Sequence, residues 1–182
     1  MTPRPRKDSA PTPSLASGDA AAIVCAPMTS ATRAAAEALL AQFLRGDAHY
    51  LASSAAYGDG GNEGLARALD LFLACPEIGF VWLAFATTDN ARPAVGVCVV
   101  CYAISTSRGT LVAKLDDVTI REGWQGRGVG GEMLDALAAH LRPRGITRID
   151  TACHRDNSGA WRFYEKLGFQ PLDEERISLL LP

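Results

Sequence analysis

The stretch Gly123–Gly131, "GWQGRGVGG", joins a run of strand-forming residues to a run with helical periodicity, and it contains five glycines. An ordered glycine loses more conformational entropy than any other residue, so this density of glycines indicates a need for bare backbone. Backbone N–H groups at a helix start, together with the positive end of the helix dipole, are well suited to bind phosphate. The stretch therefore predicts a phosphate-binding turn.

The composition predicts one domain of ordinary size. The chain has 182 residues, of which 48% are hydrophobic, and this is enough to bury a real core. Residues 1–20 are rich in Pro, Ser and Ala and predict a disordered N-terminal tail. A single folded domain is accordingly expected over residues 21–182.

Charge and hydropathy argue against several classes of partner. A formal net charge of −2 gives no indication of a nucleic-acid surface. No apolar run is long enough to cross a bilayer, and the basic N-terminal residues lack the apolar segment of a secretory signal. An odd number of scattered cysteines is typical of a reduced, cytoplasmic protein. We expect a cytoplasmic protein that binds neither nucleic acid nor membrane.

The Cys-x-x-Cys pair formed by Cys98 and Cys101 does not predict a metal or redox site. Both residues lie in "VGVCVVCYAI", a run typical of a β-strand. Residues three apart on a strand point to opposite faces, so the two thiols cannot share a metal or form a disulfide. We therefore expect no bound metal.

The first part of the chain predicts one strand, then two helices separated by a flexible, glycine-rich loop. Thr29 or Ser30 is expected to cap the first helix, and Asn62 the second. In chain order these elements are 21–27 (strand), 31–45 (helix), 55–64 (loop) and 63–75 (helix).

The second part predicts an antiparallel three-strand meander followed by alternating helices and strands. Short turns join the meander strands, which requires adjacent antiparallel pairing. This order of elements predicts a mixed α+β sheet. The expected strands are 79–88, 94–105, 110–120, 146–154 and 176–181, and the expected helices are 128–145 and 157–168.

Two other interpretations of the glycine stretch are less well supported. A helix start without a ligand needs only a glycine or two. A dinucleotide site would use Gly126, Gly128 and Gly131 as Gly-x-Gly-x-x-Gly, with Asp150 on the ribose. Rossmann glycines follow their strand directly, however, whereas "REGWQ" intervenes here, and too few residues remain for further βαβ units.

Two motifs resemble those of the GCN5-related N-acetyltransferases (GNAT). "QGRGVG" at 125–130 is similar to the family's Gln/Arg-x-x-Gly-x-Gly/Ala motif, and "NSGAWRFYEKLGF" at 157–169 to its Asn-x-x-Ala-x-x-Phe-Tyr-x-x-x-Gly-Phe segment. "LDDVTI" at 115–120 resembles the family's fourth strand. The resemblance covers about residues 80–172. It implies a mostly antiparallel central sheet with helices on both faces, and acetyl-CoA as co-substrate.

The resemblance also implies a set of cofactor-binding residues. The backbone of the glycine turn would hold the CoA diphosphate, with bare glycines allowing close approach. Arg127 would add a charged hydrogen bond or remain a solvated surface side chain. Val118 would also donate its N–H to the thioester oxygen, while Asn157 would bind the CoA arm or cap its helix. The full set is Val118, Thr119, Ile120, Gln125, Gly126, Arg127, Gly128, Val129, Gly130, Gly131, Asn157 and Tyr164.

Two catalytic residues follow from the same resemblance. Tyr164 matches the family tyrosine that protonates the departing thiolate, and its ordinary pKa near ~10 suits a proton donor. Asp116 stands where some members have a glutamate that serves as general base or binds the substrate cation. It can instead pair with an arginine. Asp116 and Asp117 are expected to face opposite sides of the strand, so they cannot share one role.

The amine acceptor is less well defined by the sequence. The resemblance implies a pocket between the first two helices, roughly over 49–63, where the 58–64 loop is a candidate lid. Asp47, Asp59, Glu63 and Asp116 would favour a cationic amine, unless they simply face solvent. We expect a small primary amine such as an amino acid, a polyamine or an antibiotic-like amine. A protein N-terminus as acceptor, a CoA-binding regulatory module without turnover, and a homodimer all remain open.

Overall fold

The computed structural model describes residues 21–54, 60–87 and 91–172. The predicted N-terminal tail at 1–20 and the predicted last strand at 176–181 lie outside these ranges, as does part of the predicted loop at 55–64.

A five-stranded sheet forms the centre of the structure, in the order β1-β2-β3-β4-β5. The first four strands pair antiparallel with their neighbours in sequence, whereas β5 pairs parallel with β4. The predicted meander and the mixed, mostly antiparallel sheet are therefore confirmed. The strands are β1 (Ala22–Pro27), β2 (Gly79–Thr87), β3 (Ala94–Ser105), β4 (Thr110–Ile120) and β5 (Ile149–Thr151).

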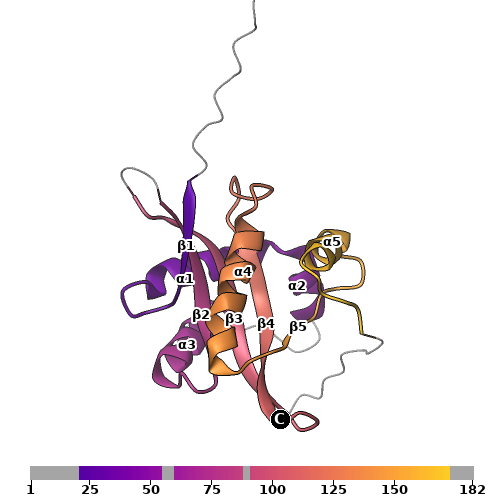
Figure 1. Ribbon diagram of the computed structural model, residues 1–182. Coiled ribbons are helices and arrows are strands. Elements are labelled where there is room, and N and C mark those ends of the chain that lie inside the picture. The colour runs from indigo at the N-terminus through magenta and orange to yellow at the C-terminus, as the bar shows by residue number, and fades with distance from the viewer. Residues whose placement is uncertain (1–20, 55–59, 88–90, 173–182) are drawn as a thin grey trace, which may run out of the picture.

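Helices cover both faces of the sheet. In Figure 1, α4 crosses in front of the strands, while α1 and α3 lie toward the other side and α5 lies beyond the β5 edge. This arrangement confirms the predicted α+β fold class. The helices are α1 (Arg33–Gly46), α2 (Ala48–Ser54), α3 (Gly61–Ala74), α4 (Val129–Leu141) and α5 (Ser158–Lys166), with a 3₁₀ turn at Arg142–Arg144.

Two hydrophobic clusters hold these layers together, one on each face. Met133 and Leu137 of α4 pack on the first face, and Leu40 of α1 and Leu69 of α3 on the second; all four side chains are buried. Cys98 belongs to the first cluster, whereas Cys101 packs against the second. The opposite orientations predicted for these two cysteines are therefore confirmed.

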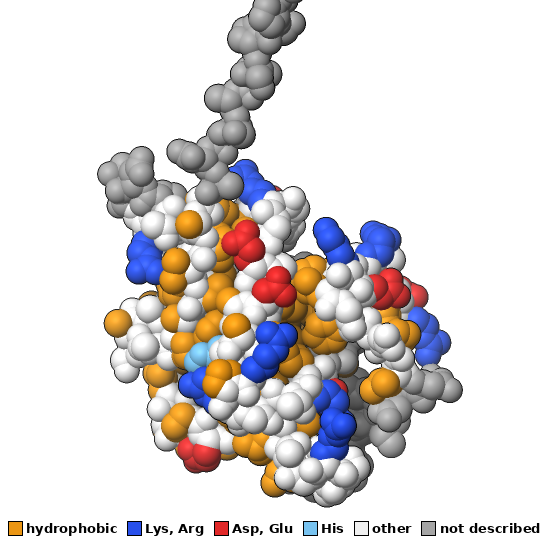
Figure 2. All heavy atoms as spheres, in the orientation of Figure 1, with side chains coloured by type: hydrophobic (Ala, Val, Ile, Leu, Met, Phe, Trp, Pro, Cys, Tyr) orange, Lys and Arg blue, Asp and Glu red, His pale blue; other side chains and the backbone are white. Residues whose placement is uncertain are grey.

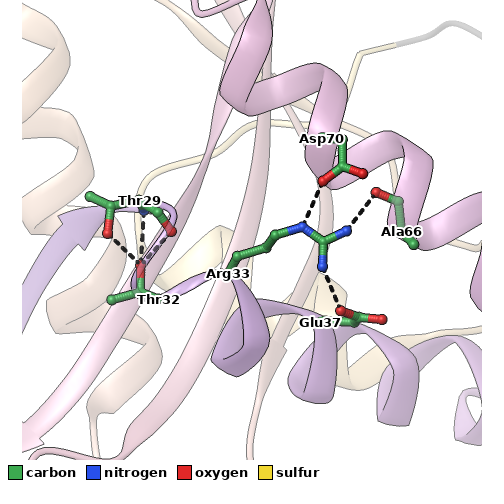
Figure 3. Close-up of polar contacts among 6 residues, drawn as sticks. All are labelled: Thr29, Thr32, Arg33, Glu37, Ala66 and Asp70. Atoms are coloured by element: carbon green, nitrogen blue, oxygen red, sulfur yellow. Dashed lines mark hydrogen bonds and ion pairs between the residues drawn. The ribbon is translucent and has the colours of Figure 1, made fainter.

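Arg33 joins the two helices of the second face. Its guanidinium donates to Asp70 Oδ1 at 2.7 Å and to the carbonyl of Ala66 at 3.0 Å, both on α3, and to Glu37 Oε2 at 2.8 Å on its own helix (Figure 3). The planar fork of arginine allows one side chain to serve three acceptors. This contact fixes the start of α1 against α3.

The predicted helix caps were wrong, because each helix begins at a different residue. Thr32 is the N-cap of α1, and its Oγ1 accepts a hydrogen bond from the N–H of Thr29 at 2.9 Å. The N-cap of α3 is Gly60, so Asn62 already lies inside the helix and its Oδ1 accepts from Arg45 at 3.1 Å. Residues 61–64 are thus helical rather than part of a loop.

The short helix α2 was not predicted. It begins directly after α1, and the carboxylate of Asp47 accepts the N–H of Tyr50 at 2.7 Å. Phe43 of α1 and Tyr50 of α2 also pack with ring centroids 5.8 Å apart. A capping aspartate three residues before the bonded amide was the available signal in the sequence.

The contact between α4 and α5 depends on Gly130. A Cβ at this position would lie 3.0 Å from Cε2 of Phe163, whereas one at Gly131 would meet nothing closer than 3.9 Å. A Cβ contact near 3.0 Å is tighter than most, so a side chain at Gly130 would require Phe163 of α5 to shift. Phe163 in turn packs edge-on against Tyr164, with ring centroids 5.1 Å apart.

We predict different consequences for alanine at these adjacent glycines. Gly131→Ala should stabilise the protein by up to about 1 kcal/mol, because alanine is the better helix former. Gly130→Ala should lose this gain and be the less stable of the two, because its methyl group meets Phe163. Urea unfolding of both variants measures the difference. Equal unfolding midpoints would show that packing against Phe163 does not require a glycine at position 130.

Candidate active site

The sheet opens between β4 and β5. The parallel pairing joins Ala113–Leu115 to Ile149–Thr151, and β5 then ends while β4 continues to Ile120. Among the described residues, no strand pairs with β4 beyond Leu115 on this side. An unpaired strand edge offers a row of N–H and C=O groups to an extended ligand. The predicted cofactor-binding residues Val118, Thr119 and Ile120 lie along this edge.

A β-bulge interrupts β4 at the start of the opening. The register passes from Val99 opposite Asp116 to Val97 opposite Thr119, so Asp117 and Val118 both lie opposite Cys98. Asp117 has a φ of 47°, a left-handed conformation that is uncommon outside glycine. The regular alternation from which we expected Asp116 and Asp117 to face opposite sides does not continue through this bulge.

The glycine turn presents a row of free amides. In the described part of the chain, none of the backbone N–H groups from Gln125 to Gly131 donates a hydrogen bond to another protein group. Residues 125–128 are exposed, and Gly126 and Gly128 have φ values of 71° and 85°. Successive N–H groups at a helix N-terminus can bind an anion, and the helix dipole adds to the attraction.

The glycines of this turn serve different purposes. Gly126 and Gly128 adopt left-handed conformations, and Gly128 is the N-cap of α4. Gly130, which we expected to admit the ligand, instead lies against Phe163 of α5, as described above. The structure therefore gives Gly130 a packing role that the motif alone did not reveal.

Two polar side chains of the turn have partners in the turn or at the end of β4. Gln125 donates from Nε2 to the carbonyl oxygen of Ile120 at 2.9 Å, which ties the turn to the end of β4. The exposed Arg127 lies with its guanidinium carbon 5.5 Å from the centroid of the Trp124 ring, within the range of a cation–π contact. Its other donors remain available at the surface.

Tyr164 lies beside the opening between β4 and β5. Its side chain is buried in the first cluster and packs against Phe169, with ring centroids 5.2 Å apart. Burial raises the pKa of Tyr164 to about 12, and a hydrogen bond with Thr151 opposes this increase. The negative charge of Asp116, an exposed residue, also contributes to the raised pKa of Tyr164.

Two contacts surround the loop between β5 and α5. Asn157 caps α5, because its Oδ1 accepts the N–H of Ala160 at 2.9 Å, and its side-chain amide N–H₂ is left as a donor. His154 stacks on His49 of α2, with ring centroids 5.0 Å apart. Helix α2 therefore lies against this loop.

A pocket of about 340 Å³ lies between the end of α1 and the end of β4. It brings together the predicted residues Thr119, Ile120 and Gln125. The sequence did not predict its other walls, which come from segments far apart in the chain and carry no motif. These are Leu39, Gln42, Phe43, Gly46, Arg121 and Glu122, while Asp47, which we had considered for the acceptor pocket, also lines this pocket.

The acidic residues considered for the acceptor pocket separate in the structure. Asp47 lines the pocket, whereas Glu63 is exposed and lies 3.9 Å from Arg67 on the surface of α3. Asp116 is exposed beside the opening of the sheet, and Asp59 lies outside the described residues. The pocket carries one acidic residue that sequence reasoning missed, Glu122.

The surface is also hollowed on the other side of the sheet. Figure 2 shows a depression between α4 and α5, with hydrophobic side chains at its floor and Lys or Arg side chains on its rim.

Within residues 21–54, 60–87 and 91–172, no cluster of metal-ligating side chains occurs and no helix is long and apolar enough to span a bilayer.

The fold is found in acetyltransferases of known structure. A ribosomal-protein-alanine N-acetyltransferase of Brucella melitensis biovar Abortus 2308 has a TM-score of 0.66 at 14% identity, covering 88% of this chain and 100% of that one. A glucosamine-6-phosphate N-acetyltransferase of Arabidopsis thaliana has a TM-score of 0.61 at 13% identity, covering 87% and 98%. At these identities the likeness shows the fold.

Sequence comparison also indicates similarity to acetyltransferases. An uncharacterized N-acetyltransferase of Methanocaldococcus jannaschii is 27% identical over 86 residues, which span 47% of this chain and 38% of that relative. The model of the acetyltransferase (GNAT) family matches residues 47–169, from the start of α2 to the end of the Tyr164 motif. With the open sheet, the amide-lined turn and the buried tyrosine in place, this match shows that the chain belongs to the acetyltransferase (GNAT) family.

Proposed function

We propose that this protein transfers the acetyl group of acetyl-CoA to a small primary amine. The observation that carries the proposal is the row of unbonded amides from Gln125 to Gly131, placed at the end of an unpaired strand edge. An extended thioester with a diphosphate at one end matches this combination. The diphosphate would bind the turn, and the arm would extend along β4 toward Tyr164 and Asp116.

The strand edge would align the thioester. Val118, Thr119 and Ile120 would hydrogen-bond the pantetheine arm as an added strand does. The bulge places Val118 outside the regular ladder, and its N–H would donate to the thioester oxygen as negative charge develops there. A pre-placed donor of this kind contributes about 3 kcal/mol in comparable acyl transfers. The remaining amide donor of Asn157 would bind the same arm.

Asp116 would assist the acceptor and Tyr164 the leaving group. An alkylammonium is protonated at neutral pH, so the amine must lose a proton before it attacks the thioester. Asp116 is exposed at the opening and would take this proton or hold the cation. Tyr164 keeps its proton at neutral pH, since burial raises its pKa to about 12, and would donate it to the CoA thiolate.

A small acceptor is favoured by the pocket beside β4. Its volume of about 340 Å³ falls within the size range of small-ligand sites, and Asp47 and Glu122 give it two carboxylates beside one arginine. A peptide N-terminus is the second candidate. The structural neighbours named above act on a ribosomal protein and on an amino sugar phosphate, so the fold accommodates both kinds of acceptor.

The direct test is a screen of amines with acetyl-CoA, read out as free thiol. Amino acids, polyamines and aminoglycoside-type amines should include at least one substrate. Short peptides with free N-termini form the second panel, and turnover confined to that panel would favour a protein acceptor. Tight CoA binding without turnover on either panel would instead support a regulatory module and overturn the proposed enzyme activity.

We predict that Gly128→Asp weakens CoA binding by at least about 100-fold, because its carboxylate would repel the diphosphate. Aspartate tolerates the left-handed conformation better than most residues, so the fold should survive. Gly109→Asp is the matched control, since Gly109 also has a positive φ of 64° and open space around its Cβ position. Calorimetric titration with CoA compares the variants. Wild-type affinity in Gly128→Asp would remove the turn from the binding site.

We predict that Tyr164→Phe lowers kcat by about 10²- to 10⁴-fold, the usual contribution of general acid–base catalysis. Affinity for acetyl-CoA should change little, because the ring and its packing remain. Tyr102→Phe is the control, since Tyr102 is a partly buried tyrosine packed against the same core cluster. Steady-state kinetics with the best amine measures both constants. A Tyr164→Phe enzyme with full kcat would exclude Tyr164 from proton transfer.

A further inference from the structure

Arg121 follows β4 directly and lines the pocket between the ends of α1 and β4. Of the arginines that the structure describes, only Arg33 and Arg121 are half-buried, and all others are exposed. Arg33 donates to three acceptors, whereas the guanidinium of Arg121 has no hydrogen-bond or ion-pair partner within the described ranges. Charged side chains are rarely buried without a partner. Arg121 therefore indicates that a ligand of this pocket supplies a negative charge.

The pocket lies on the α1 side of the sheet. Thr119, which lines the pocket, pairs directly with Val97 of the second hydrophobic cluster, and directly paired residues of neighbouring strands share a face. The glycine turn instead begins α4, which packs on the first face. A ligand in the pocket would thus approach β4 from the face opposite α4. This position suits the amine acceptor better than the CoA diphosphate.

The other walls restrict the charge of the acceptor. Asp47 and Glu122 line the same pocket, and two carboxylates would repel a ligand that carries more than one negative charge. Leu39 and Phe43 of α1 add an apolar wall. One arginine beside two carboxylates and an apolar surface matches a small molecule with one acid group, an amine and a side chain.

We propose that the acceptor is a free amino acid with a neutral or basic side chain, and that Arg121 binds its carboxylate. The inference rests on the proposed function. A planar guanidinium can donate two parallel hydrogen bonds to a carboxylate, and the amine would then lie toward Thr119. The amine nitrogen bonds to the acetyl carbon as the C–S bond breaks. The amine loses one proton, the CoA thiolate gains one, and the carboxylate is unchanged.

Amino acids and their decarboxylated analogues measure the contribution of the acid group. Lysine is compared with cadaverine, and alanine with ethylamine, because the members of each pair differ by one carboxylate. We expect kcat/KM to be about 10- to 100-fold higher for each amino acid, the usual effect of a hydrogen bond between charged groups. Glutamate and glucosamine-6-phosphate should be poorer acceptors than alanine. Equal values within each pair, or a preference for the sugar phosphate, would overturn the inference.

Substitution of Arg121 assigns this preference to one side chain. Arg121→Gln should lower kcat/KM for the amino acids by about 10- to 100-fold without lowering it for the decarboxylated amines. Arg121→Lys keeps the charge but not the planar fork, so an intermediate value is expected. Arg108→Gln is the matched control, since Arg108 is exposed in the turn between β3 and β4 and should leave every value unchanged.

A calorimetric titration with CoA separates the two ligands. All three variants should bind CoA with an affinity within about twofold of the wild type. If Arg121→Gln weakens CoA binding and keeps the preference for amino acids, Arg121 belongs to the CoA site and the inference is overturned.

The two proposals fail in different ways. If the wild type turns over no small amine, the proposed function fails before any variant is made, and the amino-acid acceptor fails with it. If the wild type is active but amino acids have no advantage over their decarboxylated analogues, only the role of Arg121 and the acceptor class are overturned.

Discussion

The parting of β4 from β5 after Leu115 and Thr151 is the constraint on which the site depends. β3 holds β4 in place on one side along almost its full length, so β4 stays extended without a partner on the other. An extended strand with a free edge is stable only when the rest of the sheet supports it. Here α4 and the first hydrophobic cluster provide that support from one face, and α1 from the other.

Three functional features lie along the opening between β4 and β5. Free amides lie beyond the end of β4, the bulge at Asp117 lies near the start of the opening, and Tyr164 lies beside the last β4–β5 pair. Each belongs to a different segment of the chain. Gly130, in the helix that follows the turn, lies against Phe163, the neighbour of Tyr164 in α5.

The two proposed proton-transfer groups differ in their burial. Tyr164 is buried among aromatic rings and retains its proton, whereas Asp116 is exposed to solvent at the opening. A buried acid and an exposed carboxylate suit different steps of an acyl transfer to an amine.

The sequence by itself determined the order of the described elements apart from α2, the meander, the opposite faces of Cys98 and Cys101, and the family to which the chain belongs. These follow from local patterns: alternation of apolar residues, turn residues, and two motifs with fixed spacing. Only the tertiary structure decided that β5 ends at Thr151, that the strand alternation is broken at Asp117, and that Gly130 faces Phe163. It also decided the pocket walls at Gln42, Phe43 and Glu122. Such features depend on contacts between segments distant in the chain, and a pattern of neighbouring residues carries no information about the distance between them.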